Sequence, residues 1–387
     1  MNPFKSSGLA VNVVEINPYD PRPFVFTDIA LCLRDSILAT GCAAELCVNR
    51  VGPGSISLVL GALPLSANVV EQLHPRTAAI FNFEQLAGDS PAVGLDYERW
   101  MRDWVMVDYH SRNIEHLLRR NGSGQQAFEL PIIPGPSMVF QPGAPAAKSV
   151  DVLFYGTMTE RRARILRQLE AAGLTVEAVA GAYGNELAPA LQRARLVLHI
   201  HFYETGLFPV ARMLQPVANG IPVVCEGSVF SDSSDWSQSG IVFAPYDRLV
   251  DACHTLLAAP EQAAERARRS LDFSRELDFV TPFGQLVFAI ATRAVHQGAS
   301  AGPIAPPAQR EAAARSHAGG DDRPLTTAEI EAILAEEAEH LPPEAHLGVA
   351  PLKIAEHTPG KGPHGFWIVL LLVLFSIFTI WQSMAAR

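Results

Sequence analysis

The sequence has few charged residues and lacks the short motifs of several common enzyme classes. Only 18% of its 387 residues are charged and 48% are hydrophobic, so the chain can bury sizeable cores and general disorder is excluded. The G-x-G-x-x-G turn of dinucleotide enzymes and the G-x-x-x-x-G-K-[ST] loop of NTPases are absent, as are H-E-x-x-H and G-x-S-x-G. These absences disfavour hydride transfer, NTP hydrolysis, zinc peptidase chemistry and serine hydrolase chemistry.

Cysteines and basic residues are also scarce. The five cysteines form no C-x-x-C pair and no His/Cys cluster with zinc spacing, and an odd number cannot all pair within one chain. We therefore expect free thiols in a reducing compartment. Thirty Lys and Arg against forty Asp and Glu give a net charge of -10, which disfavours nucleic-acid binding through a broad basic surface. We expect no nucleic-acid partner.

One long apolar run stands near the C-terminal end. Residues 366–381, FWIVLLLVLFSIFTIW, carry no charge and have a Trp near each end, as in an interfacial anchor. A helix over residues 365–386 is just long enough to cross a bilayer. We expect it to be a single-pass tail anchor that leaves the rest of the chain in the cytoplasm. A buried core helix is the alternative.

Short β-branched runs alternate with helical patterns on both sides of a proline-rich segment, residues 130–136. This alternation is typical of βαβ units and parallel sheets. The sequence therefore predicts an α/β fold with two Rossmann-like domains, over residues 1–140 and 150–297. Residues 298–364 are rich in proline and acidic side chains, which predicts a disordered linker between the second domain and the transmembrane helix.

The expected elements can be placed along both domains. In the first domain the strands are predicted at 11–16, 45–48, 56–60 and 78–83, with helices over 27–39 and 111–120. In the second domain the strands are predicted at 152–155, 176–180, 195–200, 221–225 and 241–244, with helices over 160–172, 209–219 and 247–257.

The loops after the expected strands of the second domain are unusually polar. Ligands of open parallel sheets bind beyond the carboxyl ends of the strands, so these loops are the first place to look for a site. Helix-start amides and two guanidinium groups could hold a diphosphate in the first loop. The candidate binding residues are Gly156, Thr157, Arg161, Arg162, Asn185, His201, Glu204 and Glu226. The two arginines could instead be solvated helix charges, and His199 and His201 could be buried core histidines.

Three of these segments carry a family resemblance. The runs DVLFYGTMTERRARIL, LVLHIHFYETG and VARMLQPVANGIPVVCE resemble the C-terminal domain of glycosyltransferases with the two-Rossmann B fold (GT-B), especially the bacterial group related to CgeB-type spore-maturation proteins. The runs FNFEQL and VMVDYHSRNIEHL resemble the N-terminal half of that group. The resemblance covers about residues 10–290. It implies a nucleotide-sugar donor on the second domain, an unknown acceptor on the first, and no further cofactor.

The resemblance also assigns roles to single residues. Arg212, eight residues before Gly220, matches an Arg common in the CgeB-like variants, while Gln215 stands where many retaining members have a Glu. No Asp-x-Asp pair occurs, so no metal is implied. We expect Arg161, Arg162 and Arg212 to stabilise the departing diphosphate.

Carboxylates are expected to bind the donor hydroxyls and to act as the general base. Glu204 or Glu226 is expected to bond donor hydroxyls, and Glu84 and Asp20, which follow first-domain strands, are the candidates for a general base. The predicted function is therefore a metal-independent, membrane-tethered glycosyltransferase. Two alternatives remain open. One is a catalytically inactive GT-B module that binds a nucleotide sugar or a partner at the membrane, and the other is a nucleotide-sugar epimerase.

Overall fold

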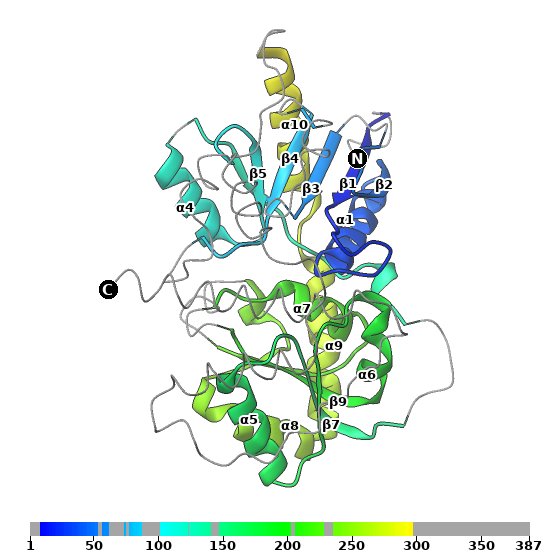
Figure 1. The fold of residues 1–387 in the computed structure, drawn as a ribbon, viewed down its shortest axis with the longest axis vertical. Coiled ribbons are helices and arrows are strands. Elements are labelled where there is room, and N and C mark those ends of the chain that lie inside the picture. The colour runs from blue at the N-terminus through cyan, green and yellow to red at the C-terminus, as the bar shows by residue number, and fades with distance from the viewer. Residues whose placement is uncertain are drawn as a thin grey trace, which may run out of the picture. The chain divides into compact units, whose positions relative to one another are not determined.

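The computed structural model describes residues 8–52, 56–61, 73–74, 77–86, 101–122, 124–140, 147–202, 206–227 and 235–296. Within these ranges the chain is mixed α/β with two parallel sheets, as in Rossmann-like domains (Figure 1). The expected linker, the expected transmembrane helix and Glu204 lie outside the described residues. None of the helices in the described ranges combines the length and the apolar character needed to cross a membrane.

The first sheet has six strands in the order β2-β1-β3-β4-β5-β6, and every neighbouring pair is parallel. Its strands are β1 (Ala10–Glu15), β2 (Ala43–Val48), β3 (Ile56–Leu60), β4 (Ala78–Asn82), β5 (Val105–Asp108) and β6 (Ala127–Glu129). Its helices are α1 (Thr27–Ala39) and α4 (Ser111–Asn121). Strands β3, β4 and β5 are buried along their whole length, which is typical of a parallel sheet covered on both faces.

The second sheet has five parallel strands in the order β11-β10-β9-β7-β8. Its strands are β7 (Val150–Tyr155), β8 (Val176–Val179), β9 (Ala194–His199), β10 (Val223–Glu226) and β11 (Val242–Ala244). Its α-helices are α5 (Glu160–Ala171), α6 (Ala188–Arg193), α7 (Val210–Ala218) and α8 (Leu249–Ala258). Short 3-10 turns are η1 (Pro136–Met138), η2 (Gly184–Glu186), η3 (Asp235–Gln238) and η4 (Tyr246–Arg248).

Local sequence chemistry explains why several of these elements begin and end where they do. Helix α1 buries Ile29, Leu33 and Ile37, which are four residues apart and so share one face. Helix α5 begins after Thr159, whose side chain accepts a hydrogen bond from the Arg162 amide, and Gly173 follows its end with φ of +87°. The predicted helices over 27–39 and 160–172 are therefore confirmed to within one residue.

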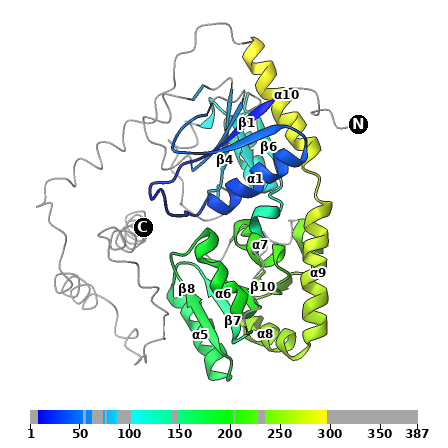
Figure 2. The same cartoon turned by 90° about the vertical axis from the view of Figure 1, so that its right-hand side faces the viewer.

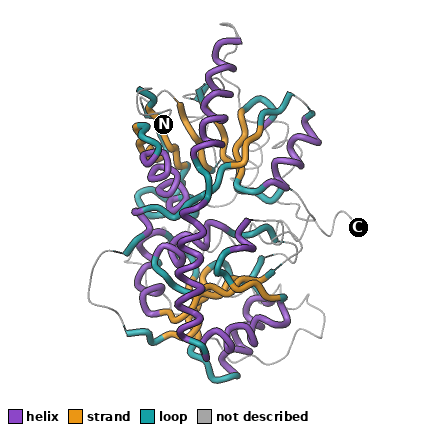
Figure 3. Tube along the Cα trace, turned by 180° about the vertical axis from the view of Figure 1, so that it is seen from behind, coloured by secondary structure: helices purple, strands orange, loops and turns teal. Residues whose placement is uncertain are grey.

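Two long helices close the described part of the chain. Helix α9 (Pro260–Glu276) contacts α7 and α8, and α10 (Val280–His296) contacts β6 of the first sheet (Figures 2 and 3). Helix α10 buries Phe283, Leu286 and Ile290 in the hydrophobic core that also contains Val105 and Val107 of β5. The sequence patterns described above predict none of α6, α9, α10, β5 and β6. Helix α10 ties the end of the described chain to the first sheet.

The packing of α10 predicts the effect of two matched substitutions. Phe283 is 2% exposed and Phe288, on the same helix, is 73% exposed. We expect Phe283→Ala to lower the free energy of unfolding by about 3–5 kcal/mol, because a large buried side chain leaves a cavity. Phe288→Ala should change it by less than about 0.5 kcal/mol. Urea unfolding followed by circular dichroism measures both, and equal effects would contradict this packing.

Candidate functional site

A buried ion pair lies at the carboxyl edge of the second sheet. Arg161, in the first turn of α5, donates from both terminal nitrogens to Glu226, the last residue of β10, with Nη1 2.7 Å from Oε2. Glu226 is 3% exposed and also accepts from the backbone amide of His201 at 2.8 Å. The structure therefore brings together three residues that the sequence analysis selected. The Glu226 carboxylate holds the other two in place.

Arg162 is a buried cation held by backbone carbonyls. Its side chain is almost fully buried, with Nε and Nη2 at 3.0 and 2.8 Å from the carbonyl oxygen of Ile200. Its Nη1 donates to the carbonyl oxygen of Thr157 at 2.6 Å. Burial and the nearby positive charges of Arg212 and Arg161 together lower the pKa of Arg162 to about 9, against the opposing effect of the Glu226 carboxylate. Three guanidinium groups are thus close enough to repel one another.

Arg212 lies over the glycine turn that follows β7. Its Nη1 donates to the carbonyl oxygen of Tyr155 at 2.7 Å, and the Tyr155 hydroxyl donates back to the carbonyl oxygen of Arg212. Gly156 has φ of +137°, and a Cβ atom at this position would lie 2.6 Å from Arg212 Nη1. Glycine is required here both for the backbone conformation and for the room that the guanidinium occupies.

Two histidines lie beside these arginines and are neutral. His199 and His201 are both buried, with ring centroids 5.3 Å apart. Burial lowers the pKa of each ring. His201 and the neighbouring arginines lower the pKa of His199 further, whereas Glu226 partly opposes the lowering of the pKa of His201. Nε2 of His201 is buried and has no hydrogen-bond partner among the residues that the structure describes. The edge therefore combines three cations, one carboxylate and a neutral imidazole, an arrangement that attracts an anion.

The other candidates from the second sheet lie elsewhere. Asn185 is exposed in η2, whose Glu186 accepts from the guanidinium of Arg22 at 3.1 Å. Gln215 is buried, and its Nε2 donates at 2.8 Å to the Oδ2 atom of Asp28 and to the carbonyl oxygen of Gly184. The Gln215 amide is thus bonded to α1 and η2.

The two candidate bases lie after strands of the first sheet. Asp20 is exposed in the turn that follows β1. Glu84 is half-buried after β4, and its carbonyl oxygen accepts from the side-chain amides of Asn82 and Asn113, each at 2.9 Å. The turn that carries Glu84 is therefore fixed by two buried asparagines.

A buried carboxylate that the sequence analysis missed holds this turn. Asp108, the last residue of β5, is fully buried and accepts from Asn82 Nδ2 at 2.6 Å and Asn113 Nδ2 at 2.9 Å. Its Oδ1 atom accepts from the backbone amide of His110 at 2.8 Å. Asn82, Asp108 and Asn113 all fall inside the two runs that carry the first-domain resemblance. The sequence signal that could have identified Asp108 is an acidic residue at the end of a buried strand.

Comparisons with known proteins give weak sequence matches. No family model matches the chain. Curated relatives from Acanthamoeba polyphaga mimivirus are uncharacterized protein L138, 27% identical over 135 residues, and uncharacterized protein L140, 28% identical over 142 residues. The matches cover 34% and 36% of this chain, and 15% and 47% of the respective relatives. The chain thus spans less than half the length of the curated relatives it matches.

Solved structures similar to the chain are GT-B glycosyltransferases. An α-glucosyltransferase in complex with UDP and a 13-mer DNA has a TM-score of 0.48 at 9% identity, covering 74% of this chain and 100% of that chain. Anabaena HepE in complex with UDP and glucose has a TM-score of 0.48 at 11% identity, covering 73% and 100%. AviGT4, a glycosyltransferase involved in avilamycin A biosynthesis, has a TM-score of 0.47 at 16% identity, covering 73% and 98%.

The burial of Asp108 predicts a pH effect on stability. Burial raises its pKa from 3.8 to about 7, against the opposing effect of its three hydrogen bonds. The native state therefore holds a proton that the unfolded state has lost. The contribution of this group to stability is present below about pH 4 and decreases by about 1.4 kcal/mol per pH unit up to about pH 7.

Asp108→Asn should remove this decrease of stability with pH. It should also lower the free energy of unfolding at every pH, because the Nδ2 donor of the new asparagine would face the nitrogen donors that Asp108 accepts from. Asp247→Asn, an exposed control, should keep the slope. Urea unfolding between pH 4 and pH 8 measures both variants. A wild-type slope that survives in Asp108→Asn would show that other groups cause it.

Proposed function

We propose that the chain is a glycosyltransferase that binds a nucleotide-sugar donor at the carboxyl edge of its second sheet. The observation that carries this proposal is the cluster of cations around Arg162, which lies within electrostatic range of Arg161, Arg212 and one carboxylate, Glu226. Positive charge exceeds negative charge among these four groups. A nucleoside diphosphate supplies the missing negative charge in the place where open parallel sheets bind their ligands.

The same arrangement suits the chemistry of sugar transfer without a metal ion. Cleavage of the bond between the sugar and the diphosphate builds negative charge on the leaving oxygen, and fixed cations stabilise that charge best. Arg161 and Arg162 are already held by internal hydrogen bonds, so they need little rearrangement. Arg212 is half-buried over the Gly156 turn and is the cation best placed to reach a phosphate oxygen.

The remaining roles are assigned by the same reasoning. Nε2 of His201 lies at the cation cluster and can donate to an oxygen of the donor. Glu204, the other candidate for donor hydroxyls, keeps its role as a prediction from the sequence. Glu84 is the preferred base over Asp20, because two buried asparagines fix the turn that carries it.

An inactive module that binds a nucleotide sugar is the second candidate. It is favoured by Gln215, whose amide is bonded to Asp28 and Gly184 and carries no charge for a ribose hydroxyl. Glu226 is likewise bonded to Arg161 and to the His201 amide. Nucleotide binding without hydrolysis or transfer of the sugar would favour this candidate over the enzyme.

A membrane tether forms part of the proposal and rests on composition alone. The uncharged run over residues 366–381 supports an anchor, and residues 298–364 support a flexible connection to it. We expect a chain truncated at residue 360 to move from the membrane fraction to the soluble fraction with an unchanged thermal melt. Aggregation of the truncated chain would assign the run to the core instead.

Substitutions at the Gly156 turn test the donor site. We expect Arg212→Ala to weaken binding of UDP, ADP or GDP, whichever the wild type binds, by about 10- to 100-fold, because a charge-assisted hydrogen bond contributes roughly 1.5–3 kcal/mol. Gly156→Ala should weaken it as well, since the added Cβ displaces the guanidinium. Isothermal titration with EDTA present measures the affinity and tests metal independence.

Arg195→Ala is the matched control for these titrations. Arg195 is an exposed arginine near the amino end of β9, at the opposite edge of the same sheet. Its substitution should leave nucleotide affinity unchanged. Equal affinity in Arg212→Ala and the wild type would place the diphosphate elsewhere, and loss of binding with EDTA would contradict a metal-independent site.

A further inference from the structure

Tyr246 contacts Arg161 at two points. The Cζ atom of the Arg161 guanidinium lies 4.0 Å from the centroid of the Tyr246 ring, and the Tyr246 hydroxyl donates to the backbone carbonyl oxygen of Arg161 at 2.6 Å. Tyr246 is half-buried in η4, two residues after the end of β11. We propose that Tyr246 is a positioning residue that orients the Arg161 guanidinium for the phosphates of the donor. This inference rests on the proposed function and adds a residue that acts on the donor through Arg161.

The Tyr246 ring and the Glu226 carboxylate restrict the Arg161 guanidinium in different ways. Glu226 accepts from both terminal nitrogens of Arg161, so it fixes one edge of the planar group. The ring lies against the guanidinium and limits its rotation about that edge. An arginine side chain loses much conformational freedom when it is fixed. Because this cost is met in the free protein, less of it remains to be met when an anion binds.

The ring holds the guanidinium without neutralising it. The face of a tyrosine ring attracts a cation through its quadrupole, but the side chain carries no net charge. A second carboxylate in the place of Tyr246 would also hold Arg161, but it would cancel positive charge that a diphosphate needs. An aromatic contact is therefore well suited to an arginine that must be both rigid and available to an anion.

Aromatic rings also lie beside the other two guanidinium groups of the cluster. The Tyr155 hydroxyl donates to the backbone carbonyl oxygen of Arg212, and Cζ of Arg212 lies 5.9 Å from the Tyr155 ring centroid. Cζ of Arg162 lies 5.4 Å from the ring centroid of Phe154 and 5.3 Å from that of Phe202. The contact described above, at 4.0 Å, is shorter than any of these three, so it is the one to test.

The experiment titrates UDP, ADP or GDP, whichever the wild type binds, into the full chain carrying Tyr246→Leu or Tyr246→Phe. We expect Tyr246→Leu to weaken binding about tenfold, because a guanidinium that is no longer oriented loses most of a charge-assisted hydrogen bond to phosphate. Tyr246→Phe keeps the ring and should stay within about threefold of the wild type. Wild-type affinity in Tyr246→Leu, or equal losses in both variants, would overturn the proposal. Tyr246→Gln, which also removes the ring, replaces Tyr246→Leu if that variant does not fold.

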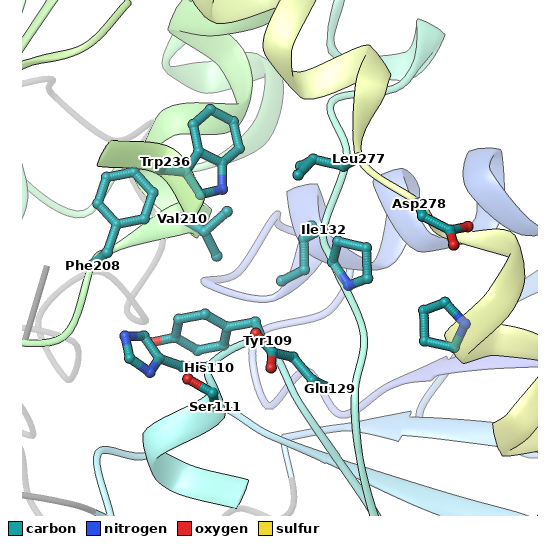
Figure 4. A pocket seen from close by; sticks show the side chains of 12 residues that line it. Tyr109, His110, Ser111, Glu129, Ile132, Phe208, Val210, Trp236, Leu277 and Asp278 are labelled. Carbon is teal, nitrogen blue, oxygen red and sulfur yellow. The ribbon is translucent and has the colours of Figure 1, made fainter. Parts of the chain in front are cut away.

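Tyr109→Leu is the matched control, because it makes the same change in another half-buried tyrosine. The Tyr109 ring is stacked on Phe83, with centroids 5.9 Å apart. Figure 4 shows Tyr109 at a cleft of about 470 Å³, and the described residues that line this cleft do not include Arg161, Arg212 or Tyr246. Tyr109→Leu should leave nucleotide affinity unchanged. A tenfold loss in this control as well would show that the effect is a general one of losing a tyrosine ring.

A second substitution tests whether Tyr246 acts through Arg161. Arg161→Gln removes the charge and keeps an amide donor for Glu226. We expect it to weaken nucleotide binding about tenfold, and we expect Tyr246→Leu to add less than about twofold in this background. A full additional loss would show that Tyr246 acts independently of Arg161. Wild-type affinity in Arg161→Gln would show that Arg161 does not bind the donor, and either result overturns the proposal.

A crystal structure of Tyr246→Leu without nucleotide separates this inference from the proposed donor site. If the wild type binds none of the three nucleotides, the donor site fails, and the structure then tests the positioning role by itself. A guanidinium of Arg161 that has moved away from its wild-type position supports that role, and an unmoved one overturns it. If the wild type binds a nucleotide and the Tyr246 variants bind it equally well, only the positioning role fails.

Discussion

The buried positive charge of Arg162 is the constraint on which the site depends. A guanidinium that is 3% exposed loses most of its hydration, and here its donors are satisfied by the carbonyl oxygens of Ile200 and Thr157. Ile200 directly follows β9, and Thr157 lies in the loop after β7. The hydrogen bonds that satisfy the Arg162 charge therefore also fix the two loops between which a phosphate would lie. In the same way, the Glu226 carboxylate satisfies the charge of Arg161 and holds that side chain in place.

The two sheets are joined by polar contacts close to the site. Gln215 connects α7 to Asp28 of α1, and Arg22 connects the turn after β1 to Glu186 of η2. Burial raises the pKa of Asp28, while the hydrogen bond from Gln215 lowers it. Helix α7 also carries Arg212. The Gln215–Asp28 contact, which joins the sheets, and the Arg212–Tyr155 contact, which positions the guanidinium, therefore both come from α7. The position of Arg212 is thereby linked to the packing of the first sheet.

The sequence predicted the regular elements better than the connections between them. The strand over 56–60 and the helix over 27–39 were predicted at their observed bounds. The strand is a short apolar run typical of a buried strand, and the apolar residues of the helix repeat with the period of an amphipathic helix. The three-residue strand β6 and the polar helix α9 give weak periodic signals. The convergence of the cations could be expected from the order of the strand-end loops, but the bonds of Arg162 to carbonyl oxygens depend on three-dimensional contacts between distant loops.

The proposed function requires that a nucleoside diphosphate binds over the Gly156 turn without a metal ion. A crystal structure of the protein with bound UDP in the presence of EDTA tests it most directly. We expect a phosphate oxygen within hydrogen-bond distance of the Arg212 guanidinium, with Arg161 and Arg162 in the positions described above. Phosphates bound away from the second sheet, or held only when a divalent ion is restored, would contradict it.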